Sequence, residues 1–398
     1  MRAVASATDS PDDVHQAVAA LHQSPAKAAL ILTGGGFQAL TSILTVPGAS
    51  KTVLDVRVPY ASASLADVLG FVPQRYADPG TASAMARKAY QQAANLAAFG
   101  EEILGVSLTC ALATDRSKKG EHKAIAATHN GHCTTTYVLQ MAKGRRHRAG
   151  EDEVASRLLL HALCSASLAS ASFHIPLLLH EDEAGAQESS ETLDDPLAAL
   201  LEDKVQSVEY SGGHVVVDAP RRGRIYLPGS FNPLHDGHRD MLAAACAIED
   251  REQDGCFELS VGNADKGFLE VDIIRQRVQQ FIDAGLPLVV TQAPLYTIKA
   301  KILPDSVFVV GFDTAIRLID PKYYGGHTGM LLQFAELAHL GCRFLVAGRV
   351  ADDKRFMQLS DMDLPEELSR MELFKDIPES AFRSDVSSTQ LREKQLND

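Results

Sequence analysis

The sequence predicts an α/β protein of two domains, in which the C-terminal domain is a Rossmann-like doubly wound parallel sheet. At 398 residues the chain is long enough for two hydrophobic cores. From residue 222 onward, short apolar runs alternate with helical patterns, as in the βα units of a parallel sheet. An acidic, Ser- and Gly-rich stretch over 180–195 precedes this half. We therefore expect domains over 1–175 and 222–398, joined by an acidic linker and a hairpin over 176–221.

Composition narrows the class of protein and of partner. Hydrophobic residues make up 45% and charged residues 22%, which is typical of a soluble globular protein. The net charge of -13 argues against non-specific nucleic-acid binding, and no apolar run reaches the length of a membrane span. Six cysteines without a C-x-x-C pair indicate reduced thiols. We expect a cytoplasmic protein without nucleic-acid or membrane partners, and the acid-free residues 1–8 leave an organelle open.

The N-terminal half contains its own strands and helices. Strand-like runs cover 27–33, 51–60 and 104–110, and an Ala-rich helix is expected over 81–99. Asn130-Gly131 between 122–129 and 132–141 predicts a hairpin, followed by a helix over 151–170. This order resembles the CinA C-terminal domain family, whose active members are nicotinamide-nucleotide deamidases. Three matches carry the resemblance: Thr33-Gly34-Gly35, Pro47-Gly48-Ala49-Ser50 and Tyr60. It implies a CinA C-terminal-like α/β domain over 1–175.

The departures from that family predict a catalytically inactive domain. The family's proposed nucleophilic serine falls at Ile31, and its lysine falls at Leu65. Neither side chain can attack an amide or move a proton. The family's Gly-rich phosphate loop is replaced by Cys110-Ala-Leu-Ala-Thr114. We expect this domain to serve in assembly, as the contact of a homo-oligomer or as a support for the C-terminal domain.

The stretch from Gly229 to His238 contains the chain's main candidate site. A strand over 225–227 stops at Pro228-Gly229, and a helical pattern follows over 236–250. His235 and His238 are three residues apart, so both can face the same side of the first turn. The first N–H groups of a helix lack internal partners and favour an anion. Isolated His-x-x-His is usually a pair of surface histidines, but Gly229, Phe231 and Pro233 make a polyphosphate site the better interpretation.

Gly229-Ser-Phe-Asn-Pro-Leu-His-Asp-Gly-His238 resembles the Gly-x-Phe-x-Pro-x-His-x-x-His signature of the nucleotidylyltransferase superfamily, which includes nicotinamide-mononucleotide adenylyltransferases and cytidylyltransferases. Val386-Ser-Ser-Thr-Gln-Leu-Arg392 resembles that family's Ile-Ser-Ser-Thr-x-Ile-Arg motif. The resemblance implies that catalysis involves His235, His238 and Arg392. It implies that the nucleotide is bound by Gly229, Ser230, Phe231, Ser387, Ser388 and Thr389. A plain helix N-cap is the rival interpretation of the second motif.

Three further positions resemble family features. Lys266 resembles a phosphate-binding lysine of the catalytic set, with an ordinary surface lysine as the alternative. Gly311-Phe-Asp313 resembles the Gly-x-Asp step that meets the acceptor or the ribose, with an N-cap as the alternative. Arg349 is expected to bind phosphate or to close a loop. Mg²⁺ is expected to arrive with the triphosphate, and no carboxylate cluster requires a metal cage in the protein.

These features together predict a nucleotidylyltransferase. It would move a nucleoside monophosphate from ATP or CTP to a phosphorylated small-molecule acceptor and release pyrophosphate. A nicotinamide mononucleotide acceptor fits the deamidase-like fusion, although the chain has no Trp and offers Tyr323 and Tyr324 instead. The alternative is a nucleotide-binding pseudoenzyme that acts as a structural or regulatory subunit. The acceptor, the base and the oligomeric state stay open.

Overall fold

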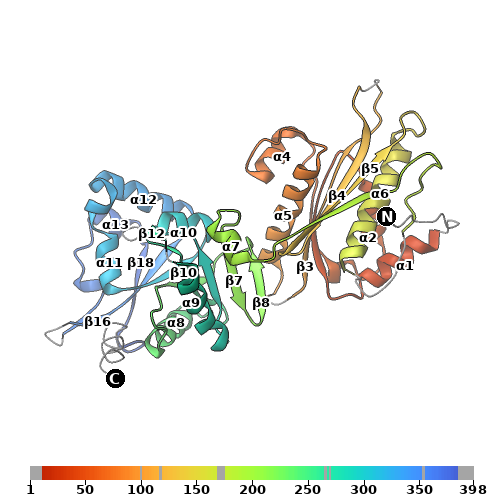
Figure 1. Ribbon diagram of the computed structural model, residues 1–398. Coiled ribbons are helices and arrows are strands. Elements are labelled where there is room, and N and C mark those ends of the chain that lie inside the picture. The colour runs from red at the N-terminus through yellow and green to blue at the C-terminus, as the bar shows by residue number, and fades with distance from the viewer. Residues whose placement is uncertain are drawn as a thin grey trace. The chain divides into compact units, whose positions relative to one another are not determined.

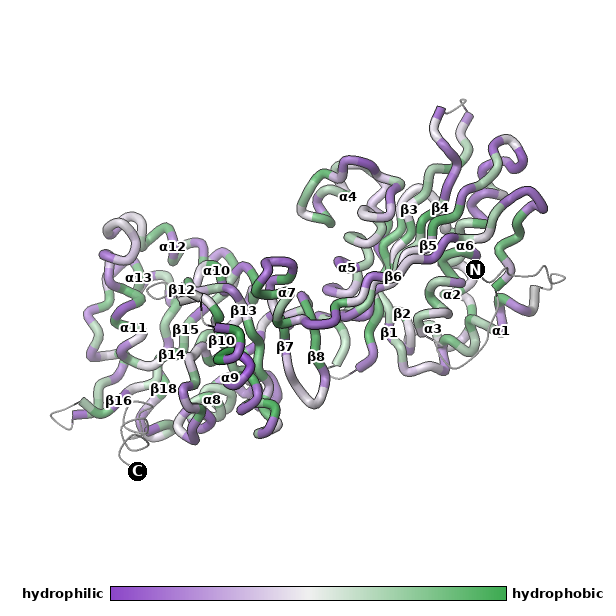
Figure 2. The backbone as a smooth tube through the Cα atoms, viewed as in Figure 1, coloured by the Kyte–Doolittle hydropathy of each residue, from purple (hydrophilic) through white to green (hydrophobic). Residues whose placement is uncertain are grey.

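The computed structural model describes residues 11–98, 101–115, 119–167, 175–263, 267–268, 270–351 and 355–383. The chain divides into two compact units, Met1–Asp194 (unit 1) and Asp195–Asp398 (unit 2). Each unit contains a predominantly hydrophobic sheet covered by helices (Figures 1 and 2). The predicted two-domain α/β fold class is therefore confirmed.

Unit 1 is built on a six-stranded mixed sheet in the order β2-β1-β3-β4-β5-β6. Its first three strands in the chain are parallel, because helices connect them. The later strands are antiparallel and begin with the hairpin at Asn130-Gly131. The strands are β1 (Lys27–Thr33), β2 (Val53–Arg57), β3 (Ile103–Ala111), β4 (His122–His129), β5 (Cys133–Met141) and β6 (Gln187–Thr192).

Helices cover both faces of this sheet. On one face, α1 (Pro11–Leu21), α2 (Phe37–Thr45) and α6 (Arg148–Ser167) pack against the largest apolar cluster of unit 1 (Figure 1). On the other face lie α4 (Ser62–Leu69) and α5 (Pro79–Leu96), while α3 (Ala49–Thr52) precedes β2. A Cβ at Gly105 would lie 2.0 Å from the carbonyl oxygen of Ala86, so glycine allows α5 to lie directly on β3.

The segment expected to be a linker is partly built into unit 1. Strand β6 pairs antiparallel with β5, although its six side chains are all exposed and its hydrophilic colours stand out in Figure 2. Backbone hydrogen bonds to β5 position this strand. Because its side chains are all exposed, its sequence lacks the alternation of apolar and polar residues that would predict a strand. Composition therefore predicted a linker where the structure has an edge strand.

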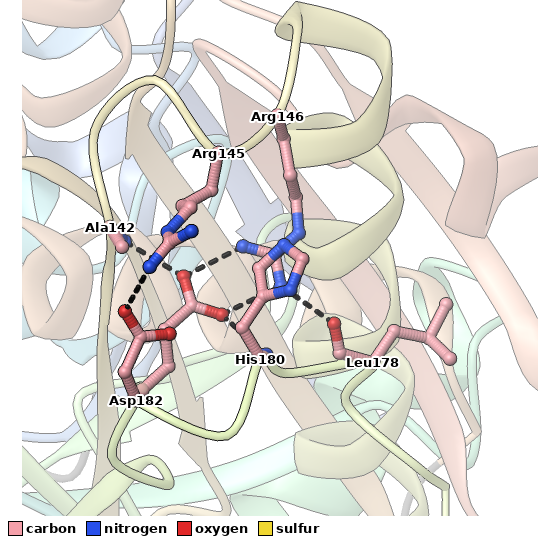
Figure 3. Close-up of polar contacts among 7 residues, drawn as sticks. Ala142, Arg145, Arg146, Leu178, His180 and Asp182 are labelled. Atoms are coloured by element: carbon pink, nitrogen blue, oxygen red, sulfur yellow. Dashed lines mark hydrogen bonds and ion pairs between the residues drawn. The ribbon is translucent and has the colours of Figure 1, made fainter.

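A buried ion pair holds the chain just before β6. The Glu183 carboxylate accepts hydrogen bonds from Arg146 Nη1 at 2.7 Å and from Arg146 Nη2 at 2.6 Å. It also accepts the N–H groups of His180 at 2.8 Å and Ala142 at 2.7 Å. Burial raises the pKa of Glu183, but these donors outweigh burial and lower the pKa to about 2. Figure 3 shows this region, in which Arg146 also donates to the carbonyl of Leu178.

Unit 2 contains an eight-stranded sheet in the order β18-β15-β14-β9-β10-β13-β7-β8. The first six of these are parallel, and numbered along the chain they read 6-5-4-1-2-3, the doubly wound Rossmann order. The chain reverses direction across the sheet between β9 and β14, which is the topological switch point. These strands are β9 (Ile225–Pro228), β10 (Gly255–Ser260), β13 (Leu288–Thr291), β14 (Val307–Gly311), β15 (Arg343–Ala347) and β18 (Phe374–Ile377).

A hairpin extends the unit 2 sheet, and helices cover its two faces. The hairpin consists of β7 (Ser207–Ser211) and β8 (His214–Val217), and β7 pairs antiparallel with β13. One face packs against α7 (Pro196–Leu201), α8 (Asp236–Ile248) and α9 (Val271–Asp283). The other packs against α10 (Tyr296–Ile302), α11 (Phe312–Leu318), α12 (His327–His339) and α13 (Glu366–Arg370). In the described part of the chain, no helix is long and apolar enough to cross a membrane.

Replacing Glu183 with Gln should destabilise unit 1, because Arg146 would keep a largely buried charge without its carboxylate. Breaking a buried pair costs about 3–5 kcal/mol. The measurement is hydrogen–deuterium exchange of the full chain, followed over peptides of β5, β6 and α6. Asp182→Asn is the matched control, because the Asp182–Arg145 pair at 2.9 Å is exposed and should change exchange little. Equal exchange in Glu183→Gln and the parent would contradict the role of this pair.

Candidate functional site

The loop after β9 lies at the switch point, and Phe231 fixes its shape. The Gly229 N–H donates to the Glu258 carbonyl on β10 at 3.0 Å. The Phe231 ring is 1% exposed and packs edge-on against Phe257 and Phe281, with centroids 5.4 and 5.0 Å away. A Cβ at Gly229 would lie 2.7 Å from the Phe231 ring. The Phe231 ring therefore lies in the core and requires glycine at 229, and the expected nucleotide contact of this residue stays a prediction.

The two histidines lie together at the N-terminus of α8. His235 is the N-cap residue with extended backbone, and His238 lies in the first turn. Their rings stack with centroids 3.7 Å apart and planes 25° apart, and the Phe231 ring meets His238 edge-on at 5.1 Å. The His235 N–H donates to His238 Nδ1 at 3.3 Å. Because Nδ1 accepts, the neutral His238 ring carries its hydrogen on Nε2.

Both imidazoles are neutral donors near pH 7. Burial lowers the pKa of His235. Burial, and then the neighbouring His235, lowers the pKa of His238 to about 4. The pair therefore presents ring N–H groups beside a helix N-terminus without two full positive charges. A bound polyphosphate would favour the protonated rings, since an adjacent anion stabilises imidazolium.

Helix α9 holds the same loop through two residues that the sequence analysis did not identify. Arg277 Nη1 donates to the Ser230 carbonyl at 3.0 Å. The Gln280 amide donates to the Phe231 carbonyl at 3.3 Å and accepts the Leu234 N–H at 3.0 Å. Arg277 and Gln280 are three residues apart, so one helix face carries both. That spacing is the only signal in the sequence, and it does not reveal the partner.

A second polar group lies at the ends of β14 and β15. Asp313 is in the first turn of α11, and Arg349 follows β15. Arg349 Nε lies 3.0 Å from Asp313 Oδ1, and both side chains are about half exposed. Gly311 and Ala347 are register partners in parallel strands, so both turns leave the sheet at one edge. A Cβ at Gly311 would meet open space, so nothing fills the position next to this pair.

The remaining predicted positions lie outside the described residues. These are Lys266, Ser387, Ser388, Thr389 and Arg392. Their roles stay predictions. Over the residues that are described, no group of three or more His, Cys, Asp or Glu side chains could hold a metal ion.

In unit 1, the positions expected to have lost catalytic groups belong to the core. Ile31 is 3% exposed and Leu65 is 1% exposed, and both lie in the apolar cluster under α4 and α5. Asp152 Oδ1 accepts the Gly36 N–H at 2.7 Å, at the N-terminus of α2. A carboxylate of the chain itself thus occupies the helix N-terminus that follows the Gly-rich turn, where an external anion would otherwise be favoured.

Arg148 fills the neighbouring space in unit 1. Its guanidinium donates to the carbonyls of Gly34 at 3.1 Å and Ala113 at 3.0 Å, and to the Tyr60 hydroxyl at 3.2 Å. These three partners follow β1, β3 and β2 respectively. The carboxyl edge of the parallel strands is therefore linked by the chain's own side chains.

Comparisons with known proteins give partial structural likenesses. No family model matches the chain, and no curated protein matches it. The competence/damage-inducible protein CihA from Agrobacterium tumefaciens has a TM-score of 0.32 at 17% identity, over 40% of this chain and 98% of that one. A CinA-superfamily protein from Escherichia coli has a TM-score of 0.31 at 16% identity, over 40% and 94%.

Another solved structure is similar over a comparable share of the chain. It is the Plasmodium falciparum nicotinic acid mononucleotide adenylyltransferase complexed with NaAD. Its TM-score is 0.27 at 12% identity, over 44% of this chain and 83% of that one.

The titration of His238 tests the geometry of the site directly. In the free protein, we expect its ring to stay neutral down to about pH 4, because burial and His235 disfavour the charge. Saturation with a nucleoside triphosphate should raise that pKa. The measurement is an NMR pH titration of labelled imidazole, with the resonance assigned by His238→Ala. Titration of the free protein near the ordinary value of about 6.5 would contradict the buried, stacked arrangement.

Proposed function

We propose that unit 2 is a nucleotidylyltransferase, which moves a nucleoside monophosphate from a nucleoside triphosphate to a phosphorylated acceptor. The observation that carries the proposal is the stacked pair His235 and His238 at the N-terminus of α8. This pair follows the strand at the switch point of a doubly wound sheet, where such folds bind nucleotides. The signature from Gly229 to His238 supports the same reaction class.

The reaction needs alignment and charge stabilisation more than it needs a protein nucleophile. An acceptor phosphate oxygen attacks the α-phosphorus, the bond to the bridging oxygen breaks, and pyrophosphate leaves with the electron pair. Negative charge grows on the phosphate oxygens as this happens. His238 Nε2–H, His235 and the free N–H groups of α8 would donate to those oxygens. Arg277 and Gln280 would keep the loop in place and so preserve the alignment.

Asp313 and Arg349 would bind the parts of the two substrates that lie away from the histidine pair. In the free protein each neutralises the other in an exposed pair. Such a pair costs little to separate, because exposed salt bridges contribute about 0–1 kcal/mol. Arg349 could then bind a phosphate, while Asp313 accepts from a ribose hydroxyl or from the acceptor.

We propose that Mg²⁺ binds together with the triphosphate. Mg²⁺ in such sites is bound mainly by phosphate oxygens and water. In the described residues, the segments after β9 and β14 supply donors and two carboxylates, Asp236 in the first turn of α8 and Asp313 in the first turn of α11, and no cluster of three, which fits an ion brought by the nucleotide. Its chemistry would be to neutralise the phosphate oxygens, while the histidines orient them.

A pyridine mononucleotide is the acceptor that we propose first. Tyr323 is 54% exposed in the 3-10 turn Pro321–Tyr324 after α11, and Lys322 Nζ lies 4.8 Å from its ring centre. Tyr324 instead donates its hydroxyl to the Leu318 carbonyl at 2.7 Å, so Tyr323 is the tyrosine of this pair that is available to stack. ATP and CTP both fit the chemistry of the site.

Replacing His238 with Ala should lower turnover by about a hundredfold or more, the loss that follows removal of one transition-state donor. The assay is pyrophosphate release with ATP or CTP, Mg²⁺ and a panel of phosphorylated acceptors that begins with pyridine mononucleotides. His214→Ala, an exposed histidine on β8, is the matched control and should keep full activity.

Two results would overturn the proposal. One is equal turnover of His238→Ala and the parent chain with an accepted substrate. The other is a triphosphate that raises the melting temperature of the parent without pyrophosphate release from any acceptor. That second result would identify unit 2 as a nucleotide-binding pseudoenzyme.

A further inference from the structure

Unit 1 contains a cavity that is separate from the polar edge described above. It has a volume of about 160 Å³ and lies between α5 and the edge strand β2. Its floor is formed by β1, through residues that include Ala29 and Ile31. The polar side chains around it come from β2 and from the C-terminal half of α5: Asp55, Arg57, Lys88, Gln91, Gln92 and Asn95.

The register of the sheet explains why charged groups of β2 face this cavity. Asp55 pairs with Ala29 and Arg57 with Ile31, in parallel strands. Ala29 and Ile31 belong to the apolar cluster under α5, so their partners point to the same face. Arg57 Nε bonds Asp55 Oδ2 at 2.9 Å, which leaves the two terminal nitrogens of the guanidinium for other acceptors.

The face of α5 toward β2 contributes a row of donors. Gln91 and Gln92 each lie three or four residues from both Lys88 and Asn95, so the four residues line one side of the helix. In the described chain, the side chains of Lys88, Gln91 and Gln92 make no hydrogen bond or ion pair, and Lys88 is half-buried. Two cations and one carboxylate around the cavity leave an excess of one positive charge, in a chain whose net charge is -13.

We propose that this cavity binds a small oxyanion, a phosphate or carboxylate group. The ammonium of Lys88 and the terminal nitrogens of Arg57 would hold the charge, and the amides of Gln91 and Gln92 would donate to its oxygens. A volume of about 160 Å³ equals roughly five water molecules at about 30 Å³ each. That volume suits a small anion better than a whole nucleotide, since pockets for larger ligands measure about 300–1,000 Å³.

The need to keep the edge strand β2 from pairing with another sheet explains only some of the charged residues around the cavity. Inward-pointing charges on an edge strand deter pairing with another sheet. This accounts for Asp55 and Arg57 on β2. It does not account for Lys88, which lies on the helix, lines the same cavity and has no side-chain partner among the described residues. A ligand accounts for both sets.

The test uses the full chain carrying His238→Ala, so that phosphate binding in unit 2 is weakened. Isothermal titration calorimetry with inorganic phosphate and, separately, malonate is run at ionic strength held constant with chloride. We expect saturable binding of at least one anion. Lys88→Gln and Arg57→Gln should each weaken it at least tenfold. Lys51→Gln, an exposed lysine of α3, is the matched control and should leave the affinity unchanged.

The separate titrations with phosphate and malonate distinguish which class of oxyanion the cavity binds. Binding of phosphate alone identifies a phosphate or phosphate-ester site, and binding of malonate alone identifies a carboxylate site. The proposal fails if neither anion binds saturably, or if both Lys88→Gln and Arg57→Gln keep the parent affinity. If Lys88→Gln lowers the melting temperature of the protein without ligand, the affinity of Arg57→Gln alone decides the test. Arg57 is suitable because it is an exposed residue on the edge strand.

Discussion

The packing of the Phe231 ring beneath Gly229 is the contact on which the candidate site depends. That ring fills the position that a Cβ of residue 229 would take, and it joins the core between β10 and α9. The ring therefore constrains the course of the loop from β9 to α8. The His238 ring makes a T-shaped contact with the Phe231 ring, and the His235 ring stacks on the His238 ring. A hydrophobic contact thus sets where the two imidazoles lie, and burial favours their neutral form in the free protein.

The two units differ in the groups that lie at the carboxyl edge of their parallel strands. In unit 2, the turns after β9 and β14 leave imidazole and backbone donors at the switch point, and the exposed pair Asp313–Arg349 is cheap to separate. In unit 1, Asp152 already satisfies the N-terminus of α2, and Arg148 bonds the turns of all three parallel strands. At this edge of the parallel strands, unit 2 therefore presents imidazole groups and an exposed ion pair, whereas in unit 1 the chain's own side chains bond to the turns.

Much of this organisation was predictable because it depends on local patterns. Apolar strands, the Asn130-Gly131 hairpin and the βα alternation after residue 222 predicted the fold class. Gly229, Phe231 and the two histidines predicted the site loop, although the buried role of Phe231 needed the tertiary structure. Arg277, Gln280 and the pairing of Arg146 with Glu183 were not predictable. Each joins segments far apart in the chain, and a lone Arg or Gln in a helix has the same appearance whether it faces a partner or water.

We propose that a nucleoside triphosphate binds with its phosphates against the N-terminus of α8. The most direct measurement is a crystal structure of the full chain with Mg²⁺ and a non-hydrolysable triphosphate analogue. We expect phosphate oxygens within hydrogen-bond distance, about 2.7–3.2 Å, of His238 Nε2 and of the first N–H groups of α8. A triphosphate bound elsewhere, with the His235–His238 pair facing only solvent, would contradict it.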